Sequence, residues 1–142
     1  MEGTFRYLDK EMGDFVIERM NEIVTSTAKT FRGEAELIEL SSVPPLTNNN
    51  DLAREITGYM KDVVGEQAVM LFESAGMGSE DFASYSYEVP SLYYILGAGA
   101  KHEGPEYGLP MHNGCVVFNE DILPTGAALH THAAIEWLKN NK

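Results

Sequence analysis

The sequence contains one cysteine, no long hydrophobic run and few basic residues, and each shortage excludes a class of protein. The single cysteine, Cys115, rules out an internal disulfide framework and favours a reducing, cytoplasmic compartment. No apolar stretch approaches the length of a membrane span, and the N-terminus lacks the basic-then-apolar pattern of a secretory signal. Only 10 Lys and Arg residues oppose 22 Asp and Glu residues, and the resulting net charge of -12 would be repelled by nucleic acid or an anionic membrane. We therefore expect neither as a partner.

The residues that are present are typical of a folded α/β protein. The chain has 142 residues, of which 44% are hydrophobic, so it is long enough to bury a core. Apolar runs of strand length alternate with segments of helical periodicity, which predicts a largely parallel or mixed sheet flanked by helices. Strands are predicted at residues 3–8, 34–40, 68–72, 91–97 and 115–118.

Four helices are predicted from their starting signals and apolar spacing. Asp9 caps the first, one of Asn48 to Asn50 or Asp51 caps the second, Ser79 caps the third, and Pro124 opens the last. Apolar residues at helical spacing define the expected buried faces. These are Met12, Phe15, Val16, Met20 and Ile23 in the first helix; Leu52, Ile56, Tyr59, Met60 and Val63 in the second; and Leu129, Ala133 and residues 135–138 in the last.

The segment "SSVPPLTNNN", residues 41–50, is the best candidate for a domain boundary. Two prolines remove backbone donors, and Pro44 moves Val43 out of the helical region, so the segment fits a linker. A β-α-β unit is predicted before it. The rest of the α/β pattern follows it.

Residues that could carry chemistry are few. His112 lies in a loop just before a predicted strand, where α/β folds place ligands, although spacing alone favours a structural role. Glu80 and Asp81 follow a glycine-rich turn, either as an ordinary acidic first turn of a helix or beside amides that hold a carboxylate. Cys115, next to two valines, is expected to be a buried small apolar residue rather than a nucleophile.

Five segments in order carry a family resemblance that covers residues 2 to about 138. They are "EGTFRYLD", "PPLTNNNDLA", "GMGSEDFASY", "VPSLYYILG" and "LPMHNGCVVFNEDILPTGAA". Together they resemble the aminoacylase, hippurate hydrolase and carboxypeptidase family of co-catalytic zinc metallopeptidases. The resemblance implies that residues 1–42 are half of a small β-α-β lid domain that mediates dimerisation. Residues 43–142 would be the C-terminal half of an α/β catalytic domain.

The same resemblance implies roles for individual residues. His112 would be a ligand of a site for two divalent ions, zinc or else manganese or cobalt. Arg6 would bind the substrate carboxylate, Gly78 and Ser79 would line the substrate site, and Glu80 and Asp81 would lie directly behind it. The general base and the other ligands would lie upstream of this chain, so no catalytic residue falls within it.

Two functions from different classes follow. The parent protein would be a homodimeric enzyme that hydrolyses the amide bond of an N-acyl amino acid or small peptide, with the isolated chain inactive. The alternative is a non-catalytic folded fragment or self-associating binding module. A two-metal hydrolase needs several metal ligands and a general base, so the number of ligands in the chain distinguishes the enzyme from the non-catalytic fragment.

Overall fold

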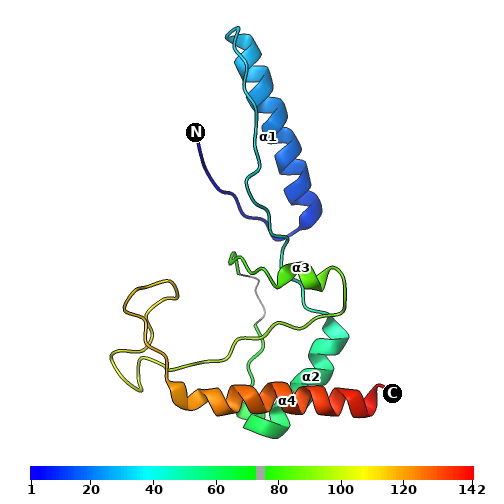
Figure 1. Ribbon diagram of the computed structural model, residues 1–142, viewed down its shortest axis with the longest axis vertical. Coiled ribbons are helices and arrows are strands. Elements are labelled where there is room, and N and C mark those ends of the chain that lie inside the picture. Colours follow the sequence, from blue (N-terminus) through cyan, green and yellow to red (C-terminus); the bar gives the residue numbers. More distant parts are fainter. Residues whose placement is uncertain (73–75) are drawn as a thin grey trace. The chain divides into compact units, whose positions relative to one another are not determined.

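The computed structural model describes residues 1–72 and 76–142, in which helices alternate with coil (Figure 1). The chain divides into two units. Met1–Asn48 and Phe72–Ser91 form the first, and Asn49–Leu71 and Leu92–Lys142 form the second. Among the described helices, none combines the length and the apolar character needed to cross a membrane.

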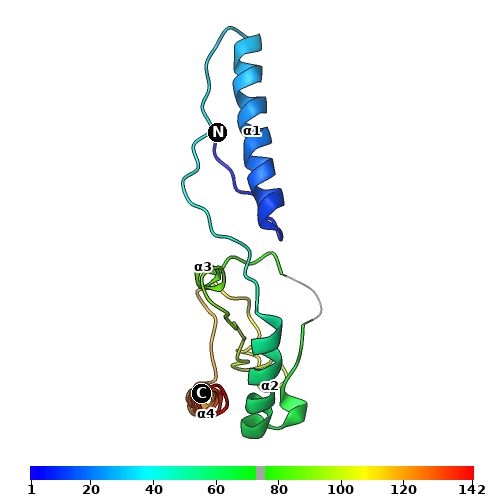
Figure 2. The same ribbon diagram turned by 90° about the vertical axis from the view of Figure 1, so that its right-hand side faces the viewer.

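The first unit is built around α1, Lys10–Thr30, which begins where the sequence predicts. The Asp9 side chain accepts a hydrogen bond from the Met12 amide and so satisfies one free donor of the first turn. At the other end, Gly33 donates to the Ala28 carbonyl and Arg32 to the Lys29 carbonyl, which is a Schellman ending. Arg32 takes the left-handed conformation (φ 60°) that a glycine usually fills there. The chain then runs back in the opposite direction to α1 (Figures 1 and 2).

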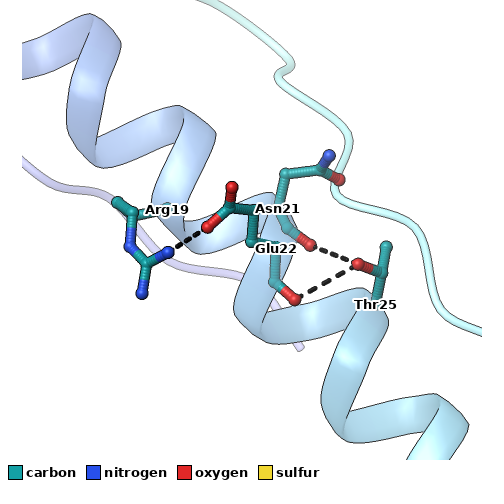
Figure 3. Close-up of polar contacts among 4 residues, drawn as sticks. All are labelled: Arg19, Asn21, Glu22 and Thr25. Atoms are coloured by element: carbon teal, nitrogen blue, oxygen red, sulfur yellow. Dashed lines mark hydrogen bonds and ion pairs between the residues drawn. The ribbon is translucent and has the colours of Figure 1, made fainter.

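Polar side chains along α1 bond within the helix (Figure 3). Arg19 pairs with Glu22 one turn later, and the Thr25 hydroxyl donates to the carbonyls of Asn21 and Glu22 at 2.8 and 3.2 Å. Such exposed pairs contribute at most about 1 kcal/mol each to stability. The Arg19 and Glu22 side chains are about half exposed, so this face of α1 contacts water.

The apolar stripe predicted for α1 is exposed, which corrects the expectation that it is buried. Met12, Phe15 and Ile23 are each more than half exposed, whereas Gly13 is the buried residue of this helix. Periodicity identifies the apolar side of a helix, but burial also needs an element to cover that side. No described element does so here.

The second unit has a small core between two helices. α2, Asn50–Val64, packs against α4, Leu123–Asn140, through Ile56 and Met60 on one helix and Leu129 and Ala133 on the other. Each pair is spaced by four residues, as an apolar stripe requires. Leu52, Tyr59, Val63, Val64, Val69, Leu92, Tyr94 and Leu96 surround this core.

The ends of these helices match their sequence signals. The Asn49 side chain accepts from the Leu52 amide at 2.9 Å, so Asn49 caps α2, and Pro124 lies in the first turn of α4. The short helices η1, Glu66–Ala68, and η2, Glu120–Ile122, follow α2 and precede α4. The prediction that residues 135–138 supply apolar core contacts is wrong for Ile135 and Leu138, whose side chains are exposed.

Hydrogen bonds join the C-terminal end of α4 to α2. The Tyr59 hydroxyl donates to Glu55 Oε1 at 2.7 Å, and Asn140 and Asn141 donate to the Tyr59 hydroxyl and to Glu55 Oε1 at 2.9 and 2.8 Å. The hydrogen bond to the Glu55 carboxylate raises the pKa of Tyr59. These bonds supplement the apolar packing between the two helices.

The predicted α/β class is wrong for this structure, because the described residues form helices and coil and contain no strand. Residues 3–8, 34–40, 69–72, 91–97 and 115–118 are coil instead, while Ala68 ends η1. A strand exists only when its amides and carbonyls pair with a neighbouring strand. In the described part of the chain, one backbone hydrogen bond joins distant segments outside the helices, from the Asn119 amide to the Ala98 carbonyl. Local sequence favoured strands, but the pairing is missing.

Candidate functional site

Arg6 contacts the glycine-rich segment at residues 76–79, and both belong to the first unit. Arg6 Nη1 donates to the Met77 carbonyl at 2.8 Å across 71 positions of sequence. Among the described residues, the Arg6 guanidinium makes this one hydrogen bond, so its other N–H groups are bonded to no described residue. The structure therefore brings together two of the predicted substrate-binding elements.

Packing on α1 holds the segment that carries Arg6. The rings of Phe5 and Tyr7 lie 5.5 Å apart, and the Tyr7 ring lies over Gly13, where an added Cβ would be 2.5 Å from Cε2. Side chains two apart share one side of an extended chain, and the residue between them points to the other side. Arg6 accordingly bonds to Met77 while its neighbour Tyr7 packs on the helix.

The turn at residues 78–81 does not begin a helix at Ser79, which corrects that prediction. The helix α3, Ala83–Ser86, starts later and has Phe82 as its N-cap, without a side-chain cap. The Glu80 carboxylate accepts from the Phe82 amide at 3.3 Å, and the Glu80 carbonyl accepts from the Ala83 amide at 3.1 Å. The Glu80 carboxylate therefore occupies the Phe82 amide that a Ser79 cap would have used, and no described helix begins at Gly78 and Ser79, where a helix start was expected to bind a carboxylate.

His112 belongs to the second unit and lies exposed in a tight loop. It has the left-handed backbone conformation (φ 65°), and the next residue, Asn113, closes the loop. The Asn113 side chain accepts from the Cys115 amide at 2.8 Å, and its carbonyl accepts from the Val116 amide at 3.1 Å. Cys115 is exposed, so the expectation that it is a buried apolar residue is wrong.

The described residues do not complete a metal site. Across residues 1–72 and 76–142, no group of three or more His, Cys, Asp or Glu side chains is arranged to hold an ion. His112 is an accessible candidate ligand, but a two-metal site needs several ligands around each ion. No step of metal chemistry is assigned to this chain.

His130 and His132 make contacts of a structural kind. His130 lies with its ring 5.1 Å from that of Tyr94, and His132 Nε2 lies 3.7 Å from Asp62 Oδ2 across the contact of α2 with α4. Burial raises the pKa of Tyr94.

Sequence reasoning missed three residues that shape the Arg6 region. A carbonyl such as that of Met77 belongs to every residue, so no pattern could single it out. Tyr7 looked like an ordinary strand residue. Gly13 was the available signal, because a glycine inside a helix weakens it and often marks close packing.

Comparisons with known proteins agree on one family. The model of peptidase family M20/M25/M40 matches residues 6–136. An IAA-amino acid hydrolase (ILR1-like 2) of Arabidopsis thaliana is 32% identical over 127 residues, covering 86% of this chain and 28% of the relative. A thermostable carboxypeptidase of Saccharolobus solfataricus is 28% identical, covering 96% and 34%. An N-acetyldiaminopimelate deacetylase of Streptococcus suis is also 28% identical, covering 87% and 31%. The chain thus spans about a third of the length of these relatives.

Proposed function

Because this chain belongs to peptidase family M20/M25/M40, we propose that it forms part of a metal-dependent amidohydrolase. The substrates proposed are N-acyl amino acids or small peptides, in keeping with relatives named as an IAA-amino acid hydrolase, a carboxypeptidase and a deacetylase. The chain spans about a third of such relatives, so it would act with a further segment. We use the name "assembled enzyme" for this chain together with the upstream segment of a relative.

The contact between Arg6 and Met77 is the observation that most supports this proposal. A bound carboxylate would lie against the N–H groups of Arg6 that bond to no described residue, because the planar fork of the guanidinium suits two parallel hydrogen bonds. Gly78 and Ser79 follow Met77 directly and are exposed, and we propose that they line the same site. Glu80 and Asp81 would support that turn from behind.

His112 would supply one metal ligand in the assembled enzyme. Members of this family generally bind two metal ions, and zinc, manganese and cobalt all suit histidine and carboxylate ligands. The other ligands and the general base would come from the upstream segment. The contribution of this chain would then be to bind substrate and one metal ion.

Replacing Arg6 by Met should weaken only the reaction of substrates that have a free carboxylate. In the assembled enzyme, kcat/KM for benzoylglycine is expected to fall roughly 10- to 100-fold, since hydrogen bonds to charged groups contribute about 1.5–3 kcal/mol. Benzoylglycinamide, which lacks the charge, should react equally with both enzymes. Arg19→Met, an exposed arginine on α1, is the matched control. Equal losses on both substrates would show that Arg6 does not recognise the carboxylate.

A cytoplasmic homodimer completes the proposal. Exposed apolar side chains on α1, including Met12, Phe15 and Ile23, offer a surface that a second copy could cover. The charge of -12 opposes association, but screening over about 8 Å at physiological salt weakens that repulsion. Light scattering across a dilution series would detect the dimer.

A further inference from the structure

We infer that Tyr7 is a positioning residue for Arg6, and that Gly13 provides the space in α1 that Tyr7 needs. This inference rests on the proposed carboxylate-binding role of Arg6. It adds two residues that the family resemblance did not indicate. All the groups involved, Tyr7, Gly13, Arg6 and Met77, belong to the first unit.

Any other residue at position 13 would require the Tyr7 ring to move. A Cβ added to Gly13 would lie 2.5, 2.6 and 2.7 Å from Tyr7 Cε2, Cδ2 and Cζ. All three distances are below the closest approach that carbon atoms tolerate, so the ring would have to move. Gly13 is also the one buried residue of α1 among those described.

A displaced Tyr7 would also displace Arg6. The two residues share a peptide bond, and the Phe5 ring, 5.5 Å from that of Tyr7, limits how the tyrosine can rotate. The backbone at residues 5–7 would therefore shift to relieve the clash. The Arg6 hydrogen bond to Met77 is 2.8 Å long, so a shift of about an ångström would break it.

Gly13 lowers the stability of α1, and its close contact with Tyr7 explains why a glycine is needed there. Alanine is the better helix former, and Gly13 lies one turn into a helix of 21 residues. A second helical glycine, Gly58 in α2, has nothing within 4 Å of an added Cβ. Gly58→Ala is therefore a matched control, because it changes helix propensity without a clash.

The test is NMR on the 142-residue chain, which needs neither metal nor turnover. Arg6→Met first identifies the shifts that report the Arg6 contact, among them the Gly78 amide, whose peptide includes the Met77 carbonyl. Gly13→Ala should move the Gly78 amide toward the Arg6→Met position and shift the Arg6 Nε–Hε signal, while helical circular dichroism stays equal or rises. Tyr7→Ala should do the same, and Tyr7→Phe should retain the wild-type spectrum because ring carbons make the contact. The Gly13→Ala/Tyr7→Ala double variant should match Tyr7→Ala.

The outcomes separate this inference from the proposed function. Wild-type Arg6 and Gly78 signals in Gly13→Ala, or equal shifts in Gly58→Ala, would overturn the positioning role. The positioning role would also fail if Arg6→Met left Gly78 unmoved. If the NMR results are as expected but Gly13→Ala and Arg6→Met both leave KM for benzoylglycine unchanged in the assembled enzyme, Tyr7 positions Arg6 and the proposed carboxylate site is wrong.

Discussion

Leu129→Ala is expected to destabilise the second unit by about 2–3 kcal/mol. Leu129 is only 5% exposed and contributes to a core of four buried residues, so its loss leaves a cavity at the contact of α2 with α4. Replacing a buried leucine by alanine lowers the free energy of unfolding by about 2 to 5 kcal/mol. A core this small can partly collapse around the cavity, so we expect an effect near the lower end of this range. A unit of this size has little stability to lose.

Urea unfolding followed by the fluorescence of the single tryptophan, Trp137 on α4, would measure this change. Leu138→Ala on the same helix is the control, because Leu138 is 61% exposed and its truncation should change the free energy of unfolding by less than about 0.5 kcal/mol. Similar losses for the two variants would contradict the core described here.

His112→Asn should remove at least one metal ion from the assembled enzyme and lower its turnover by more than about 100-fold. Groups that only orient a ligand already cost roughly 10- to 100-fold when changed, so loss of the ligand itself should cost more. Asparagine is preferred to alanine here because His112 has φ 65°, a conformation that asparagine adopts readily and alanine resists.

The control for this variant is His102→Asn, a second exposed loop histidine in the same unit. Metal content by mass spectrometry and hydrolysis of benzoylglycine should both be unchanged in that control. If the metal content and rate of His112→Asn also match those of the wild type, His112 is not a ligand.

Sequence signals that act within one turn predicted the helices well. Asp9, Asn49 and Pro124 all occupy the starts expected of them, because capping depends on the residue and on the next three amides. The spacing of Ile56 and Met60 also located the core face of α2. Ser79 failed as a cap because the Glu80 carboxylate bonds to the amide of Phe82 and competes with it.

Signals that depend on distant partners predicted poorly. The segment "SLYYILG" places Leu92, Tyr94 and Leu96 against the core with the period of two expected of a strand, yet no strand lies beside it among residues 1–72 and 76–142. Alternation specifies which side chains face inward, whereas a sheet also needs a second backbone at the right place. The prediction that the apolar stripe of α1 is buried is wrong for the same reason, because burial needs a second element to cover the stripe.

The arrangement of the candidate site was partly predictable from sequence. The resemblance selected Arg6 and the turn that contains Gly78, and the structure joins these two through Met77. It could not identify the carbonyl that Arg6 contacts, nor the ring of Tyr7 over Gly13. Both depend on backbone positions set by tertiary packing, which no single-sequence motif encodes.

The most direct test of the central claim is to assay residues 1–142 alone. Benzoylglycine would be incubated with the purified chain in the presence of zinc or manganese, beside the assembled enzyme. We expect no hydrolysis above background by the isolated chain, because its described residues provide no complete metal site. The assembled enzyme should show metal-dependent hydrolysis. Metal-dependent turnover by the isolated chain that is lost in His112→Asn would contradict our account.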